Sequence, residues 1–178
     1  MGIDADNGAL LFTHKQDTTG NVHSNAPILD KGYLYYVAGD GNRTVKLKLA
    51  DDGQSVTEVW RCKLFDNIMG GVVQLDNRLI ATGHRSSELM SLDMQSGKVT
   101  HQLKIGRGST IYADGMIYLY DEKGNVHLVD PGQGGLKEVS TFKVTRGTKE
   151  HFSHPVIANG TLYIRHGKSL MAYNIKQI

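Results

Sequence analysis

The hydrophobic positions of this chain recur in one short phrase that occurs four times. In each copy an apolar pair precedes a few turn-forming residues, and a second apolar pair follows. The copies span residues 27–35, 72–80, 110–118 and 155–163, so matching positions lie 45, 38 and 45 residues apart. Their centres, Lys-Gly, Asp-Asn, Asp-Gly and Asn-Gly, tolerate the positive φ angles of a tight turn between twisted strands. Each phrase therefore predicts a β-hairpin.

Two further strands are expected after each hairpin, separated by polar turns such as Asp51-Asp52-Gly53. The expected third strands are Val45–Leu49, Leu89–Asp93, Val126–Asp130 and Leu170–Asn174. The expected fourth strands are Val56–Leu64, Lys98–Ile105 and Leu136–Val144. Four antiparallel strands in about 38 to 45 residues, repeated in series, are typical of the blade of a β-propeller. A β-sandwich also uses short strands and turns, but it gives no reason for one phrase to recur at nearly constant spacing.

The predicted fold class is therefore all-β, a β-propeller of four-stranded antiparallel blades with four blade-equivalents in this chain. Residues 2–14 parallel residues 91–103, which predicts that the chain opens at the end of a third strand. We expect a single domain over 1–178. Residues 1–16 supply the fourth strand of a preceding or closing blade, 24–64, 70–105 and 106–144 form blades, and 153–178 form three strands of the last.

Three arrangements of these blades are compatible with the repeat. The chain is part of a larger seven- or eight-bladed ring with missing upstream blades, it closes on itself as a small ring, or two chains join head to tail as a ring-completing dimer. We expect the first, because truncation readily produces a start within a repeat.

Composition limits the partners and the chemistry of the chain. Hydrophobic residues make up 39% and charged residues 21%, which is typical of a globular protein. A formal net charge of +2 gives no support to a nucleic-acid partner, and no run approaches the roughly 18 apolar residues of a membrane span. Cys62 is the single cysteine, which excludes an intramolecular disulfide and a Cys-rich zinc site. We expect its thiol to be buried and structural.

Two motifs resemble those of a known superfamily. Ser91-Leu92-Asp93-Met94-Gln95-Ser96-Gly97-Lys98-Val99 and the hairpin Pro155 to Tyr163 are similar to the repeat of quinoprotein-like propellers. That superfamily contains pyrroloquinoline-quinone alcohol dehydrogenases and non-enzymatic members, and the resemblance implies a periplasmic or extracellular location. The repeats cover nearly the whole chain, and they are specific for the fold and weak for function.

The departures from the dehydrogenase pattern favour the non-enzymatic members. Resemblance to the dehydrogenases implies a vicinal cysteine pair over the cofactor, but this chain has a single cysteine. Trp60 falls in an expected fourth strand, where outer-blade packing is a better role than stacking on a cofactor. We therefore predict a non-catalytic scaffold that binds a protein or a polymer. The alternatives are a fragment of a dehydrogenase that binds pyrroloquinoline quinone and calcium, and a glycan-binding accessory protein.

A binding face is expected where the fourth-to-first and second-to-third strand connections meet. These loops are rich in basic residues and histidine, which would attract an anionic ligand or an acidic protein surface. Asp40, Asp66, Asp121 and Glu122 partly cancel this charge, so ordinary polar loops are the competing interpretation. The candidate residues are His14, His23, Arg43, His84, Arg85, Arg107, Arg146, Lys149, His151, His154, Arg165 and His166.

No catalytic residue and no metal site is predicted. His151 and His154 are three residues apart, but no fixed carboxylate or cysteine partner accompanies them in the sequence. The acidic segments 51–53 and 121–125 lack the spaced oxygen ligands of a calcium loop, so we predict turns there.

Overall fold

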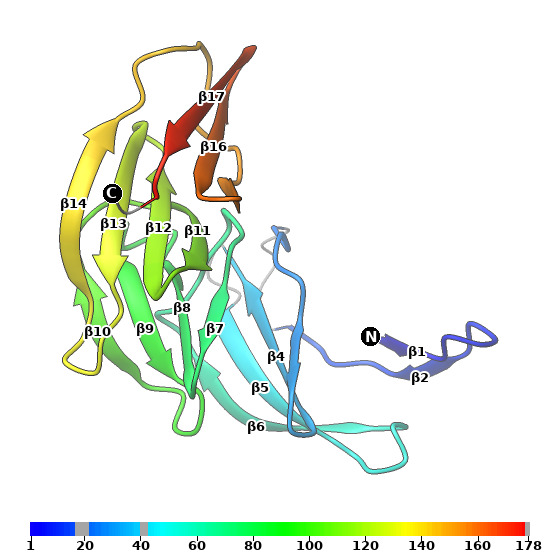
Figure 1. Ribbon diagram of the computed structural model, residues 1–178. Coiled ribbons are helices and arrows are strands. Elements are labelled where there is room, and N and C mark those ends of the chain that lie inside the picture. The colour runs from blue at the N-terminus through cyan, green and yellow to red at the C-terminus, as the bar shows by residue number, and fades with distance from the viewer. Residues whose placement is uncertain (17–21, 40–42, 177–178) are drawn as a thin grey trace.

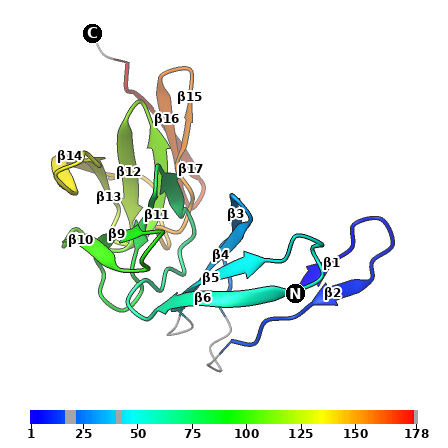
Figure 2. The ribbon, with the colours of Figure 1, turned by 90° about the horizontal axis from the view of Figure 1, so that it is seen from below.

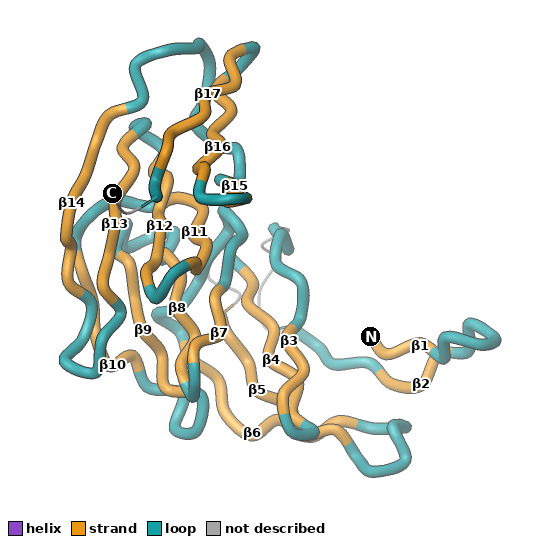
Figure 3. Tube along the Cα trace, in the orientation of Figure 1, coloured by secondary structure: helices purple, strands orange, loops and turns teal. Residues whose placement is uncertain are grey.

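The computed structural model describes residues 1–16, 22–39 and 43–176, and these residues contain strands and no helix (Figure 3). The strands form five antiparallel sheets that follow one another in chain order (Figure 1). In every four-stranded sheet each strand pairs with the next strand in the sequence. This is the expected series of blades, so the prediction of a β-propeller with four-stranded antiparallel blades is confirmed.

The strand bounds are as follows. The N-terminal hairpin contains β1 (Gly2–Ile3) and β2 (Leu10–Phe12). The first four-stranded sheet contains β3 (Ile28–Asp30), β4 (Tyr33–Ala38), β5 (Arg43–Leu49) and β6 (Val56–Cys62), and the second contains β7 (Val73–Leu75), β8 (Arg78–Thr82), β9 (Leu89–Asp93) and β10 (Val99–Leu103). The third contains β11 (Gly108–Ala113), β12 (Met116–Asp121), β13 (Asn125–Asp130) and β14 (Lys137–Lys143). The last sheet is three-stranded, with β15 (Val156–Ala158), β16 (Thr161–His166) and β17 (Ser169–Asn174).

The tight turns of the hairpins have the backbone conformation that the sequence predicts. Asp114 and Gly115, between β11 and β12, have φ angles of 50° and 78°. The flanking residues Ala113 and Met116 pair across the turn. Two consecutive positive φ angles match the twist of the strands, and Asp followed by Gly adopts them at little energetic cost.

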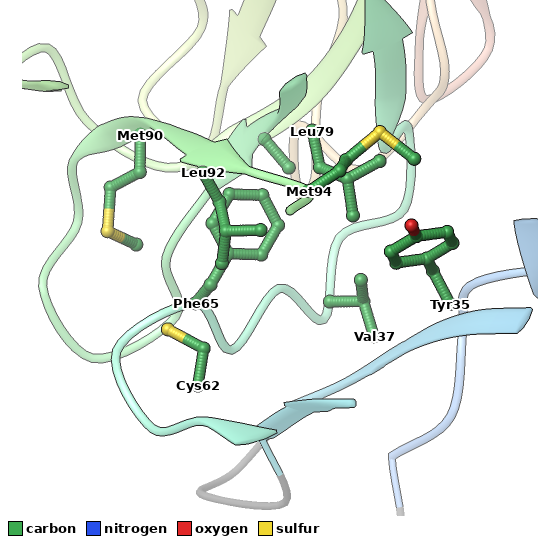
Figure 4. Packing of buried hydrophobic residues seen from close by; sticks show 9 residues of the cluster. Tyr35, Val37, Cys62, Phe65, Leu79, Met90, Leu92 and Met94 are labelled. Carbon is green, nitrogen blue, oxygen red and sulfur yellow. The ribbon is translucent and has the colours of Figure 1, made fainter. Parts of the chain in front are cut away.

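The apolar faces of neighbouring sheets pack on each other. Between the first two sheets, Tyr35 and Val37 meet Leu79 and Leu92, and Phe65 from the connecting loop fills the space between them (Figure 4). Cys62 belongs to this cluster and is buried, as expected. Similar clusters lie between the second and third sheets and between the third and last sheets. Among the described residues strand pairing stays within each sheet, so hydrophobic burial between the sheets is what packs one blade on the next.

Trp60 illustrates how the outer strand of one sheet contacts the next sheet. Its indole ring lies against Gly97, where an added Cβ would overlap the ring. Its Nε1 donates to the carbonyl oxygen of Met94 at 3.2 Å. This is the outer-blade packing predicted for Trp60, and it explains why the turn after β9 needs a glycine at position 97.

The arc of sheets is open. In Figure 2 the last sheet and the N-terminal hairpin lie at opposite ends of the arc. Among the described residues β17 pairs with β16 alone, and β2 pairs with β1. The structure is therefore a partial propeller.

Candidate binding face

One end of the sheets carries both sets of predicted loops. Successive strands run antiparallel, so the second-to-third and fourth-to-first connections emerge at the same end. We call this end the loop face. Its described segments are 13–16, 22–27, 39, 63–72, 83–88, 104–107, 122–124, 144–155 and 167–168, together with the strand ends Arg43 of β5 and Arg165–His166 of β16. Residues 17–21 and 40–42, which belong to two of the predicted loops, lie outside the described residues.

The loop between the first and second sheets is fixed from within by Asn67. This residue is fully buried, and its Nδ2 donates to the carbonyl oxygen of Thr82 at 2.9 Å. Its Oδ1 accepts from the amide of Gly70 at 2.9 Å. The hydroxyl of Thr82 donates in turn to the carbonyl oxygen of Gly108. The loop that follows the first sheet is thereby connected to the second and third sheets by polar contacts.

Asp66 fixes the neighbouring loop between β8 and β9. Its Oδ1 accepts from the backbone amide of His84 at 2.8 Å. Burial raises the pKa of the Asp66 carboxyl, although backbone hydrogen bonds from His84 and Arg85 oppose that rise. Asp66 is therefore a structural acceptor for this loop rather than an exposed negative charge.

His84 and Arg107 are brought together, although they are 23 residues apart in the sequence. Arg107 Nη1 donates to Nδ1 of His84 at 2.8 Å and to the carbonyl oxygen of His84 at 3.1 Å. Its Nε donates to Oε2 of Glu122 at 2.7 Å. The guanidinium therefore joins loops from the second and third sheets, and its charge is paired within the protein.

The turn between β12 and β13 is organised by Asp121, which is buried. Its Oδ1 accepts from the amides of Lys123 and Asn125, and its Oδ2 accepts from Nδ2 of Asn125. Burial opposes ionisation, but the hydrogen bonds from His127 and Asn125 outweigh it and lower the pKa of Asp121. This segment is a turn, as predicted.

His127 lies behind this turn, between two carboxylates. Its Nδ1 is 2.6 Å from Oε1 of Glu138, and its Nε2 is 3.4 Å from Oδ2 of Asp121. Burial disfavours the charged ring, but these two carboxylates raise the pKa of His127. His127 is not among the residues predicted from the sequence, because strand alternation alone does not show which acidic side chains would face it.

His151 and His166 form the centre of a third cluster. Their rings are stacked with centroids 3.7 Å apart. Nδ1 of His151 contacts the hydroxyl of Tyr120 in a short hydrogen bond. Burial raises the pKa of Tyr120 to about 12, so this hydroxyl keeps its proton and can donate it to the ring.

His166 fastens the long loop 144–155. Its Nδ1 is 2.9 Å from the carbonyl oxygen of Arg146, and its Nε2 is 2.7 Å from that of Lys149. Carbonyl oxygens accept and cannot donate, so both contacts are hydrogen bonds when both ring nitrogens carry protons. The buried ring thus holds two points of the loop.

Two more contacts fix the loop 144–155. The hydroxyl of Ser153 donates to the carbonyl oxygen of Arg165 at 2.6 Å. The ring of His154 lies against Gly70, where an added Cβ would meet it. The sequence pair His151 and His154 therefore points to different neighbours. Among the described residues, no three His, Cys, Asp or Glu side chains gather in a group that could hold a metal ion.

The candidates from the first part of the chain lie apart from this cluster. His14 is bonded to Tyr36 through Nδ1 and to Glu58 through Nε2, each at 3.0 Å. His14 and His23 line a cavity of about 720 Å³ between the N-terminal hairpin and the first sheet. Arg43 begins β5 of that sheet. The twelve candidates thus form separate groups on the loop face rather than one site.

Comparison with known proteins identifies the family. The sequence profile of the family described as outer membrane protein assembly factor BamB matches residues 1–177. The chain belongs to this family. The predicted resemblance to the quinoprotein-like propeller superfamily is thereby confirmed. A search of the curated proteins finds no match to the chain.

Solved structures support the same fold. BamB from Moraxella catarrhalis is 14% identical with a TM-score of 0.71, over 96% of this chain and 50% of that protein. The computationally designed Ika4 protein is 10% identical with a TM-score of 0.59, over 93% of this chain and 100% of that one. A europium-containing methanol dehydrogenase is 12% identical with a TM-score of 0.55, over 75% of this chain and 27% of that one. The chain thus spans half the length of the BamB structure that it matches.

A membrane-spanning helix is not found in the part of the chain that the structure describes. At identities of 10 to 14%, the likeness to these solved structures is evidence for the fold alone.

Proposed function

We propose that this chain is a non-catalytic propeller scaffold that binds a protein partner through its loop face. The observation that supports the proposal is that hydrogen bonds from buried side chains hold the loops of that face in place. Buried side chains such as Asn67 and His166 hold the loops from within, while Arg146, Lys149 and Arg165 are exposed. A surface ordered before binding loses less conformational entropy when a partner docks.

The family supplies the cellular setting of the proposal. Its description as an outer membrane protein assembly factor suggests a periplasmic or outer-membrane-associated location and a partner that takes part in assembly of outer-membrane proteins. In this proposal the blades support the loop face, and the partner binds to its loops. No quinone, calcium ion or other cofactor is required.

Cross-linking from the face tests the proposal. A photoreactive amino acid replaces Arg165 on the loop face, and in a matched variant it replaces Gln95, which is exposed in the turn after β9 at the opposite end of the sheets. We expect adducts with an outer-membrane assembly protein from position 165, identified by mass spectrometry, and none from position 95. Equal yields of the same adduct from both positions would contradict the proposal.

A quinoprotein dehydrogenase is the competing function, because a methanol dehydrogenase shares the fold. The purified chain is mixed with pyrroloquinoline quinone, calcium, a primary alcohol and an electron-accepting dye. We expect no dye reduction above the rate without protein. Sustained reduction that requires the chain, the quinone and the alcohol together would replace the scaffold by an enzyme.

A further inference from the structure

Positive charge is concentrated in the segment between residues 143 and 168. Its five basic residues are Lys143, Arg146, Lys149, Arg165 and Lys168, and its single acidic residue is Glu150. The segment thus has a net charge of +4, counting five positive charges and one negative. The whole chain has a formal net charge of +2, so the rest of the chain carries −2.

Two loops bring four of these cations to one place. His166, at the end of β16, contacts the carbonyl oxygens of Arg146 and Lys149. The two loops also touch through glycines, since a Cβ at Gly147 would meet the backbone of His166 and one at Gly167 would meet that of Thr148. We call the exposed basic residues of these two loops and of the end of β16 the basic corner, which consists of Arg146, Lys149, Arg165 and Lys168.

An exposed aromatic residue lies beside the basic corner. Phe152 has 59% of its surface exposed. Its neighbours are held on both sides, since His151 stacks on His166 and Ser153 bonds to the carbonyl oxygen of Arg165. The backbone on either side of Phe152 is therefore fixed although its side chain faces solvent. Phenylalanine and arginine are enriched in protein interfaces, and a backbone that is fixed before binding lowers the entropy lost on binding.

We propose that the basic corner, together with Phe152, binds an acidic segment of a partner protein that contains an apolar side chain. This inference rests on the proposed function, because it assigns the partner's chemistry at the loop face. Carboxylates of the segment pair with the four cations, and its apolar side chain packs on Phe152. The charge contrast with the rest of the chain steers an acidic segment to this corner rather than to another part of the surface.

A protein segment fits this surface better than a nucleic acid. Nucleic-acid affinity comes largely from many phosphate contacts along a basic track. Here the four cations of the basic corner lie in two adjacent loops and at the end of one strand, and the chain outside residues 143–168 has a net negative charge. The exposed ring of Phe152 gives an apolar side chain a contact next to the cations.

Fluorescence anisotropy with a labelled probe tests the inference. The probe is a peptide of about 12 residues with Asp and Glu around one central Leu, and the control peptide has Asn and Gln instead. The test variant is R146E/R165E. The matched control is K15E/K63E, which makes the same charge change at two exposed positions elsewhere on the loop face. Circular dichroism confirms that both variants fold, and R146Q/R165Q serves if the reversal variant does not.

We expect the wild type and K15E/K63E to bind the acidic peptide alike and R146E/R165E to bind it about tenfold more weakly, since each exposed ion pair contributes up to about 1 kcal/mol. F152A should weaken binding several-fold without a change of charge. Equal losses in the two double variants would overturn the inference. Tighter binding of a single-stranded oligonucleotide of equal charge would also overturn it, because the corner would then be a polyanion surface.

The outcomes separate this inference from the proposed function. If position 165 cross-links to an assembly protein but the acidic peptide does not bind, the loop face is a binding surface, and the inference that it binds an acidic segment is wrong. If position 165 gives no adduct and the chain reduces the dye, the scaffold itself is wrong.

Discussion

The imidazole rings of His151 and His166 are stacked, with their centroids 3.7 Å apart and their planes inclined by 24°. The two rings have different partners. His166 faces two backbone carbonyl oxygens, whereas His151 faces the hydroxyl of Tyr120. The stack joins the loop 144–155 to the end of β16, and it therefore supports the shape of the basic corner.

Acid should weaken this stack. Burial lowers the pKa of His151, the neighbouring His166 and Lys143 lower it further, and Asp121 acts in the opposite direction. The folded state therefore favours neutral His151. Its contribution to stability is complete above the unfolded pKa of about 6.5 and is lost as the pH falls below that value.

The comparison of wild type with H151F isolates this effect, because other groups also titrate. His127 has a raised pKa and so contributes stability that is lost as the pH rises. We expect the thermal midpoint of the wild type minus that of H151F to decrease as the pH is lowered from 7.5 to 5. A difference that stays constant or grows in acid would contradict the lowered pKa of His151.

Replacement of His166 by Leu should loosen the loop 144–155. A neutral His166 ring donates to one of the carbonyl oxygens of Arg146 and Lys149, and a ring with both nitrogens protonated donates to both. The variant loses these hydrogen bonds, which contribute roughly 1 kcal/mol each. Hydrogen–deuterium exchange should accelerate in residues 146–150 and stay unchanged in β9. H101L is the control, since the ring of His101 contacts Thr100 and lies against Gly135, both of which are outside this loop. Unchanged exchange at 146–150 would show that His166 does not fasten this loop.

Gly71 should not tolerate a side chain. It has a φ angle of +76°, and a Cβ there would overlap the backbone of Thr110 in β11. Gly115 has a φ angle of +78° with open space around it. G115A therefore measures the backbone strain, about 1 kcal/mol, and G71A adds a steric clash of about 1–3 kcal/mol. Urea unfolding should show G71A to be clearly less stable than G115A, and equal midpoints would contradict the close approach of the loop to β11.

The carboxylate of Asp121 should be essential for the turn between β12 and β13. D121N keeps an oxygen for the backbone amide of Asn125, but it replaces Oδ2 by an NH2 group that cannot accept from Asn125 Nδ2. It also leaves His127 with one carboxylate partner, so we expect a loss of roughly 3–5 kcal/mol. D114N is the matched control in the exposed hairpin of the same sheet, and it should be nearly neutral because Asn also tolerates a positive φ angle. Comparable unfolding midpoints of the two variants would contradict the structural role of Asp121.

The sequence predicts the sheets well because their signals are local. Lys31-Gly32 and Asp114-Gly115 set the positive φ angles of the hairpins, and alternating apolar residues set the buried faces. The packing role of Trp60 could also be predicted, because its strand and its neighbours repeat in each blade. Repetition turns one local pattern into a whole architecture.

The contacts at the loop face could not be predicted in the same way. His151 meets Tyr120 across 31 residues, and Arg107 meets His84 across 23. Such pairs depend on how the loops of neighbouring blades are placed in space, and the spacing of residues within one blade does not determine this. The sequence thus identified basic and histidine-rich loops, but it could not separate the side chains that fasten them from those that are exposed.

Hydrogen–deuterium exchange of the chain, measured with and without the partner that cross-linking identifies, tests the central claim most directly. We predict protection in residues 104–107, 122–124 and 144–155 on binding, and no change in the turns 51–55, 94–98 and 131–136 at the opposite end of the sheets. Protection confined to those opposite turns would contradict the claim that this propeller binds its partner through the loop face.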